Sequence, residues 1–234
     1  MNTLQYFTSL ESAVSSPFGE ETKMEQTRQL SGGDSNGAYG LTLTDGKCIF
    51  MKSNSKENLS FFTAEAAGLH AIARTEAIGT GRNLPDSWIG FFRDCRLAPQ
   101  FRDADRYFDR EDRKKILRLL DHLDEILVEP QKPSLLHGDL WAGNVITGND
   151  GRAWLIDPAV SVGHAEADIA MTELFGGFPP VFYDAYKAAA PMQPGYERRR
   201  DVYNLYHLLN HLNMFGRTYL PEVKYVVERA LQSL

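Results

Sequence analysis

The sequence predicts an α+β protein in two parts, a small amino-terminal part that contains strands and a larger, mainly helical carboxy-terminal part. Short apolar runs and glycines occupy residues 28–52, whereas apolar residues recur at three- and four-residue steps through most of the chain beyond residue 110. A segment of Gly, Pro and polar residues at 75–87 separates the two patterns. We therefore expect one part over 1–78 and a second over 79–234.

The composition favours a soluble, globular protein. Hydrophobic residues make up 43% of the 234, and 31 acidic against 25 basic residues give a formal charge of −6. That charge argues against nucleic acid or an anionic membrane surface as the main partner. The two cysteines, Cys48 and Cys95, are far apart, and the amino terminus lacks a basic region followed by a long apolar run. We expect a cytoplasmic protein with neither a disulfide framework nor a zinc site.

The amino-terminal part begins with a predicted helix and continues with two predicted strands. Apolar residues have helical spacing over residues 2–17, and we expect the helix to end before Pro17. Residues 41–44 and 48–52 have the pattern of strands, with an Asp-Gly turn between them. This pair of strands predicts a small sheet.

The segment before these strands contains four glycines, at positions 32, 33, 37 and 40. A glycine-rich loop lets backbone N–H groups close over phosphates, because no Cβ keeps the ligand away. An ordinary hairpin loop would explain the glycines equally well. Lys52, at the end of the second strand, could reach the phosphates of a nucleotide, and this favours the first interpretation.

A second predicted helix, over residues 60–74, contains Glu65. In enzymes that transfer phosphoryl groups from ATP, a helix glutamate can fix the strand lysine through an ion pair. Glu65 follows Lys52 at a suitable distance for this role. The alternative is a solvated glutamate on the helix surface.

The carboxy-terminal part is predicted to consist mainly of helices. The longest spans 198–215, with Val202, Leu205, Leu208, Leu209 and Leu212 facing inward. We interpret the aromatic residues interleaved with them, Tyr203, Tyr206 and Phe215, as core. The other predicted helices cover 111–127, which we expect Pro130 to stop, and 165–174, 180–190 and 221–234.

The segment 135–158 carries the strongest chemical signal. Two apolar runs, which we expect to form buried elements, flank a loop with His137, Asp139 and Asn144, and Asp157 follows the second run. An Asp followed by four residues and an Asn, with another Asp after a short hairpin, is the arrangement that phosphoryl transfer uses to orient a hydroxyl and hold Mg²⁺. Turn-capping roles would explain each residue alone but not the ordered set.

Three segments that follow one another in order, HGDLWAGN, DPAVSVGHAEADIAMTELFGGFP and FGRTYL, resemble the fructosamine (ketosamine) kinase family. Trp141 separates this family from aminoglycoside phosphotransferases, which usually carry histidine there. The resemblance implies a protein-kinase-like two-lobe fold, with a shortened, small β-containing N-lobe and a mainly helical C-lobe. It also implies ATP- and Mg²⁺-dependent phosphorylation of a ketosamine, such as fructosyl-lysine, at the sugar 3-hydroxyl.

The resemblance assigns a role to each candidate residue. Asp139 corresponds to the catalytic base, Asn144 and Asp157 to the Mg²⁺ ligands, and Lys52 with Glu65 to the pair that positions ATP. The phosphate loop corresponds to Gly32, Gly33, Asp34, Ser35, Asn36 and Gly37. Substrate contacts or structural support fall to His137, Trp141, His164, Glu166 and Asp168.

The chain departs from the family pattern in two places. Several tens of residues that normally follow the Glu65 helix, including the hinge that binds adenine, are absent between Ala77 and Trp88. Losing two hinge hydrogen bonds and the burial of the purine would weaken ATP binding, at about 0.5–1.5 kcal/mol for each bond. In addition, Ser161 and Val162 replace an aromatic pair, which leaves the sugar specificity open.

Two alternative functions follow from these departures. A kinase-like protein that has lost the adenine hinge could bind ligands without catalysis, although an intact Asp139, Asn144 and Asp157 argue against this. An antibiotic or choline phosphotransferase would share the fold and the chemistry, and Trp141 makes it less favoured. The sequence leaves the oligomeric state open.

Overall fold

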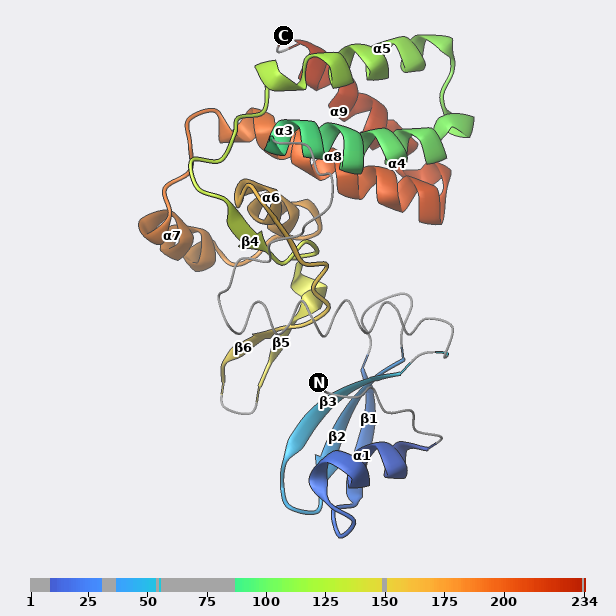
Figure 1. Ribbon diagram of the computed structural model, residues 1–234, viewed down its shortest axis with the longest axis vertical. Coiled ribbons are helices and arrows are strands. Elements are labelled where there is room, and N and C mark those ends of the chain that lie inside the picture. Colours follow the sequence, from blue (N-terminus) through green and yellow to red (C-terminus); the bar gives the residue numbers. More distant parts are fainter. Residues whose placement is uncertain (1–8, 31–36, 54, 56–86, 149–150, 233) are drawn as a thin grey trace. The chain divides into compact units, whose positions relative to one another are not determined.

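The computed structural model describes residues 9–30, 37–53, 55, 87–148, 151–232 and 234 (Figure 1). The chain divides into two compact units, 1–63 and 64–234. The predicted boundary at residue 78 and the predicted helix over 60–74 lie outside the described residues. The boundary therefore remains a prediction.

The first unit is a helix followed by a three-stranded antiparallel sheet in the order β1-β2-β3. Its elements are α1 (Leu10–Phe18), β1 (Met24–Leu30), β2 (Gly37–Leu43) and β3 (Cys48–Ser53). Val14 of α1 and Leu41 and Leu43 of β2 are almost fully buried together, so the inward face of the helix packs on the sheet. The predicted Asp-Gly turn joins β2 to β3, with Gly46 at a φ of 80°.

Two predictions for this unit were wrong. The helix does not end before Pro17, because Pro17 lies inside its last turn and Gly19, at a φ of 97°, follows its end. The strand β1 was not predicted, since MEQTRQL contains few apolar residues. It pairs with β2 from Ala38 to Leu43 and lies at the edge of the sheet, where polar side chains are tolerated.

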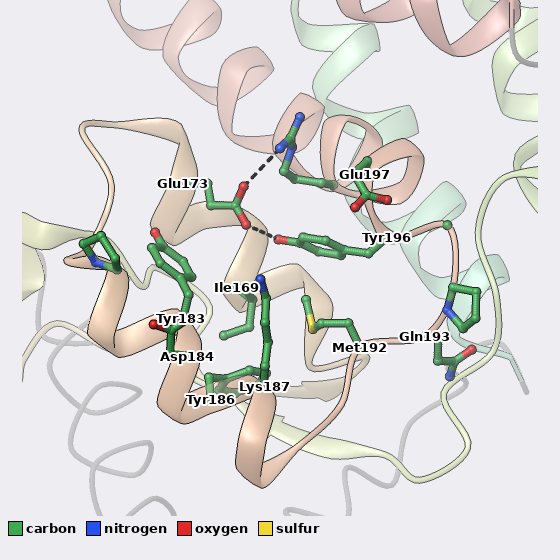
Figure 2. Close-up of a pocket in the computed structure, with 14 residues that line it drawn as sticks. Ile169, Glu173, Tyr183, Asp184, Tyr186, Lys187, Met192, Gln193, Tyr196 and Glu197 are labelled. Atoms are coloured by element: carbon green, nitrogen blue, oxygen red, sulfur yellow. Dashed lines mark hydrogen bonds and ion pairs between the residues drawn. The ribbon is translucent and has the colours of Figure 1, made fainter.

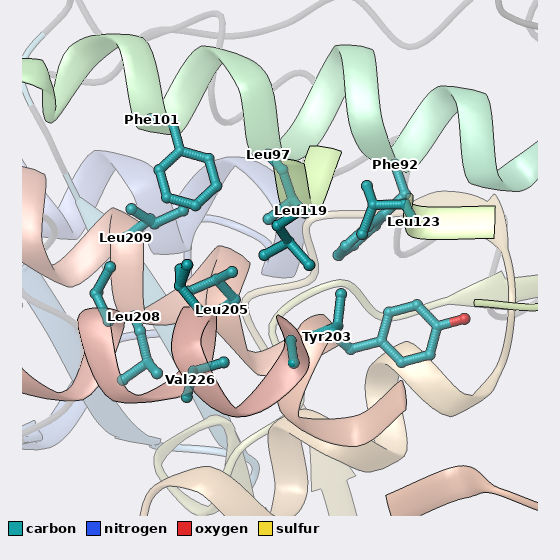
Figure 3. Packing of buried hydrophobic residues seen from close by; sticks show 14 of the residues in the cluster. Phe92, Leu97, Phe101, Leu119, Leu123, Tyr203, Leu205, Leu208, Leu209 and Val226 are labelled. Atoms are coloured by element: carbon teal, nitrogen blue, oxygen red, sulfur yellow. The ribbon is translucent and has the colours of Figure 1, made fainter. Parts of the chain in front are cut away.

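The second unit is built around the long helix α8 (Tyr196–Phe215), which packs against several other described helical segments. These are α4 (Ala98–Asp103), α6 (Glu166–Leu174), α9 (Leu220–Gln232), a π-helical segment (Phe92–Leu97) and a 3₁₀ turn (Arg217–Tyr219). All five residues predicted to face inward from this helix are buried, as Figure 3 shows for three of them. The remaining helices are α3 (Trp88–Phe91), α5 (Arg110–Asp121) and α7 (Pro180–Ala189).

The structure corrects two further details of the helices. Helix α5 ends at Asp121, well before Pro130, and a separate 3₁₀ turn over Leu123–Glu125 follows it. Tyr203 is buried in the core as predicted, but Phe215 is 46% exposed at the end of α8. Its aromatic side chain is therefore available at the surface.

Two short antiparallel ribbons hold the segment 135–158. Strand β4 (Ser134–Leu136) pairs with β7 (Ser161–Gly163), and β5 (Val145–Thr147) pairs with β6 (Ala153–Leu155). The loop between β4 and β5 carries the predicted catalytic residues, and Asp157 follows β6 directly. The second ribbon is not a buried element as predicted, because every residue of β6 is exposed.

Candidate active site

Asp139 and Asn144 are joined directly by hydrogen bonds. The Asn144 amide nitrogen lies 2.8 Å from the Asp139 Oδ2 atom and 2.8 Å from the Asp139 backbone oxygen, and it donates to both. Asn144 is buried, which fixes this geometry. The five-residue spacing predicted from the sequence therefore closes a tight loop in which Oδ1 of Asp139 remains to accept a further proton.

The burial of Asp139 changes its acidity. Burial raises the pKa of this carboxyl above its ordinary value, while the hydrogen bond from Asn144 and the nearby His211 act in the opposite direction. A carboxylate with a raised pKa is a stronger proton acceptor than a solvated one. The position suits a general base.

His137 braces the loop from beneath. Its Nε2 atom lies 3.0 Å from the Ile156 carbonyl oxygen, and its Nδ1 atom accepts from the Asp139 backbone N–H at 3.3 Å. These two partners require the neutral tautomer with the proton on Nε2. Burial lowers the pKa of the imidazole, which agrees with that neutral form. The histidine thus links Ile156, the residue directly before Asp157, to the backbone of Asp139.

Asp168, from helix α6, anchors the same loop from the other side. Its carboxylate accepts the backbone N–H of His137 at 2.6 Å and that of Gly138 at 2.8 Å. Gly138 has a φ of 80°, and a Cβ there would lie 2.1 Å from the Ala159 oxygen, so only glycine fits. Burial raises the pKa of Asp168 to about 6. These two bonds show that the residue positions the loop.

Asp157 is the one described residue other than glycine with a positive φ, at 59°. Such a conformation costs about 1–3 kcal/mol for a non-glycine residue and is found where function requires a particular side-chain direction. Asp157 directly follows Ile156, whose backbone N–H donates to the Asn144 carbonyl oxygen at 3.0 Å. The two predicted metal ligands are thus held next to each other by the β5–β6 ribbon.

Trp141 begins a row of aromatic side chains, the aromatic wall, which continues through Phe175, His211, Phe215 and Tyr219. This row was not predicted from the sequence. The Trp141 ring is 6.4 Å from that of Phe175, which is 4.7 Å from the His211 ring. Phe215 and Tyr219 continue the wall, each within 5.3 Å of His211. The helical spacing of His211 among leucines gave it the pattern of a core residue, so sequence periodicity alone could not identify it.

The predicted support residues Glu166 and His164 lie deeper in the unit. Both oxygens of the Glu166 carboxylate accept from Arg199, at 2.6 and 2.7 Å, and each of the two side chains is 3% exposed. His164 is buried and accepts the backbone N–H of Glu166 at 3.2 Å. Their contacts show that both side chains support the structure of the unit, and a role at the sugar stays a prediction.

The predicted nucleotide-binding residues are only partly described. Lys52 lies near the end of β3, opposite Ala38, and Gly37 begins β2 opposite Ser53. Gly32, Gly33, Asp34, Ser35, Asn36 and Glu65 lie outside the described residues. Their predicted roles remain predictions.

The raised pKa of Asp168 predicts a pH-dependent stability. The folded protein holds this proton up to about pH 6, whereas an unfolded aspartate releases it near its ordinary pKa of 3.8. The contribution of this group to the free energy of unfolding therefore falls as the pH rises through that window and is constant above it. Urea denaturation should show Asp168→Asn to be more destabilised relative to the parent at pH 4.5 than at pH 7, by about 2 kcal/mol. A difference that does not vary with pH would contradict this.

Comparison with known proteins places these residues in a family. A sequence profile of the fructosamine kinase family matches residues 6–85 and 81–233. The chain belongs to the fructosamine kinase family. The chain is 30% identical to the "Probable ketoamine kinase" of Synechocystis over 94% of its own length and 95% of that protein. It is 29% identical to the chloroplastic protein-ribulosamine 3-kinase of Oryza sativa subsp. indica, over 92% of its length and 82% of that protein.

A solved structure of a candidate fructosamine-3-kinase from Thermobifida fusca has the same fold. It superposes with a TM-score of 0.79 at 25% identity, over 97% of this chain and 100% of that one. The predicted α+β, protein-kinase-like fold and the predicted class, a ketosamine kinase-type phosphotransferase, are confirmed. Membership in a kinase family implies the use of ATP. Across the described residues, none of the helices could cross a bilayer by length and hydropathy.

The comparisons also concern the shortened segment that the sequence predicts between Ala77 and Trp88. The alignment with the Synechocystis protein runs over 282 positions, more than the 234 residues of this chain. Parts of that relative therefore have no counterpart here. The family profile matches in two stretches that meet at residues 81–85. This is the neighbourhood in which the sequence predicts a shortened segment.

Proposed function

We propose that this fructosamine kinase family member phosphorylates the 3-hydroxyl of a ketosamine such as fructosyl-lysine, using ATP and Mg²⁺. The observation that carries the proposal is the Asp139–Asn144 pair, which presents one carboxylate oxygen beside a buried amide. The names of the relatives, a ketoamine kinase and a ribulosamine 3-kinase, support the substrate class and the position.

In the proposed reaction, Asp139 accepts the proton of the sugar hydroxyl as that oxygen attacks the γ-phosphorus of ATP, the bond from that phosphorus to the β–γ bridging oxygen breaks, and ADP leaves. Oδ2 is held by Asn144, so Oδ1 takes the proton. His137 and Asp168 keep the backbone of the loop in place through four hydrogen bonds. The aromatic wall that begins at Trp141 offers flat apolar surface to the C–H face of a sugar.

The residues present fit a magnesium ion. Mg²⁺ prefers oxygen ligands and is usually held by one or two protein side chains together with substrate phosphates. The Asn144 amide nitrogen donates to Asp139, so its amide oxygen is not used in these bonds and would be one ligand, and the Asp157 carboxylate would be another. When bound, the ion would neutralise charge on the phosphates.

The segment that binds adenine in the family is predicted to be shortened here, so the affinity for Mg-ATP should be measured first. Mg-ATP at a hundred times its dissociation constant should stabilise a binding protein by about 2.7 kcal/mol, which appears as a raised melting temperature. We expect such a shift, together with ADP release that depends on fructosyl-lysine and a product whose phosphate is located at the 3-position by NMR. No shift at millimolar Mg-ATP, and no product, would favour a non-catalytic binding protein instead.

A further inference from the structure

A cleft lies beside helix α6, the helix whose Asp168 also contacts the catalytic loop. It has a volume of about 650 Å³ and is lined by α6, α7, the connection after α7 and the first turn of α8 (Figure 2). Asp139, Asn144 and Asp157 do not line it. The volume falls in the range of sites for small molecules.

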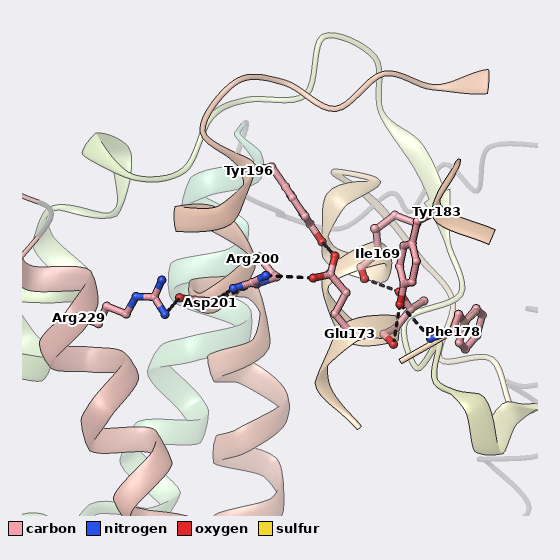
Figure 4. A network of polar contacts seen from close by, with 9 residues as sticks. Ile169, Glu173, Phe178, Tyr183, Tyr196, Arg200, Asp201 and Arg229 are labelled. Atoms are coloured by element: carbon pink, nitrogen blue, oxygen red, sulfur yellow. Dashed lines mark hydrogen bonds and ion pairs between the residues drawn. The ribbon is translucent and has the colours of Figure 1, made fainter. Parts of the chain in front are cut away.

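The walls of this cleft are fixed by contacts that leave little freedom. The Tyr183 hydroxyl is within 3.3 Å of the Thr172 hydroxyl and carbonyl oxygens and accepts the backbone N–H of Phe178 at 3.0 Å (Figure 4). Arg199 donates to the carbonyl oxygens of Gln193 and Pro194, at 2.8 Å each, and so anchors the connection between α7 and α8. These contacts hold the connection between α7 and α8 and the start of α7 in place at the cleft.

One acidic group in the cleft is already neutralised. Glu173 accepts from the Tyr196 hydroxyl at 2.8 Å and from Arg200 at 3.1 Å, and Arg200 also pairs with Asp201. Figure 4 shows these groups as one chain of contacts. Glu173 and Arg200 are thus part of the wall and are not available to a ligand.

Three further charged groups line the cleft. Asp184 and Lys187 lie three residues apart in α7 and both line the cleft, and Glu197 lies on the opposite wall in α8. Among the described residues, none of these three makes an ion pair. Figure 2 shows the Lys187 side chain extending into the middle of the cleft, beside Ile169.

We propose that this cleft binds the head group of an α-amino acid. Residues three apart on a helix have their Cβ atoms about 5–6 Å from each other, so Asp184 and Lys187 can hold an ammonium and a carboxylate that share one carbon. Tyr183, Tyr186 and Met192 supply apolar surface for the side chain of the amino acid. Glu197 leaves the cleft with one excess negative charge.

That excess charge sets the order of preference. L-Lysine carries a second ammonium and should bind more tightly than L-norleucine, which has the same length without that charge, and L-glutamate should bind least. The head group that binds could belong to a free amino acid or to the amino-acid end of a ketosamine. The ketosamine case rests on the proposed function. Both present the same chemistry to the cleft.

Saturation-transfer NMR with the three amino acids tests the site directly. Lys187→Glu replaces attraction with repulsion and should weaken L-lysine binding about tenfold, and Lys187→Met about fivefold. Lys132→Glu, at an exposed lysine that does not line the cleft, should leave binding unchanged. No binding by the parent protein, or equal binding by the parent and Lys187→Glu, would overturn the proposal.

Kinetics then separate the two sources. If the cleft holds the substrate end, Lys187→Glu should raise the KM for fructosyl-lysine about tenfold with little change in kcat, and leave the KM for fructosylated n-butylamine unchanged. If it holds a free amino acid, both KM values stay the same while the NMR effect remains, and this also supports the site. Failure to phosphorylate either ketosamine would count against the proposed function alone, because the NMR measurement does not depend on catalysis.

Discussion

Asp139→Asn is expected to reduce kcat for ketosamine phosphorylation by a factor of about 10²–10⁴, because the amide cannot accept the hydroxyl proton. The substituted side chain has the same shape, and its oxygen can still accept from the Asn144 amide that lies 2.8 Å away. The loss should therefore appear in kcat, with the KM for ATP within about twofold of the parent. Initial-rate measurements of ADP release provide the test.

The same substitution should not damage the fold. Burial raises the pKa of Asp139, which means that its charge is unfavourable where it lies, and a neutral amide removes that cost. We expect an unchanged or slightly higher melting temperature. Asp121→Asn, at an exposed carboxylate at the end of α5, is the matched control and should leave the rate unchanged. Full activity of Asp139→Asn would remove the assigned role of base.

The contacts of the catalytic loop join residues that are close together in the sequence. Asn144 directly precedes the β5–β6 hairpin and Asp157 follows it closely, and Asn144 bonds to Asp139 five residues earlier. The partners of His137 also belong to that segment. A linear pattern is sufficient where the interacting residues are close in the chain.

Partners that are far apart in the chain could not be predicted in the same way. Arg199 pairs with Glu166 across 33 residues, and nothing in its basic surroundings, the run ERRR, distinguishes it from a solvated arginine. The aromatic wall brings Phe175 against His211 through the packing of α6 on α8. Burial of the strand β6 was wrongly expected from its apolar residues alone.

The Glu166–Arg199 pair gives the largest expected effect on stability. Both side chains are 3% exposed, and two charged hydrogen bonds of 2.6 and 2.7 Å join them. Removing one partner leaves a buried charge without compensation, which costs about 3–5 kcal/mol. We expect Glu166→Gln and Arg199→Met each to lower the free energy of unfolding by that amount, measured by urea denaturation.

The two variants should differ in what they disturb. Arg199 also donates to the carbonyl oxygens of Gln193 and Pro194, so Arg199→Met leaves those groups unpaired, whereas Glu166→Gln keeps these contacts. The double variant Glu166→Gln/Arg199→Met should therefore be more stable than the sum of the two single losses predicts, because it leaves no unpaired charge.

An exposed pair of the same kind shows whether burial is the cause. Arg113 and Asp105 also form a bidentate ion pair, but their side chains are 46% and 58% exposed. Asp105→Asn should lower the free energy of unfolding far less than Glu166→Gln does, since water screens the charges and solvates the arginine that remains. Equal losses for Asp105→Asn and Glu166→Gln would show that hydrogen bonding, and not the removal of charge from water, determines the contribution of the buried pair. A small loss of stability for Asp105→Asn together with a large loss for Glu166→Gln would show that burial causes the difference. Burial of the Glu166 carboxylate is a property of the fold and could not be read from the sequence.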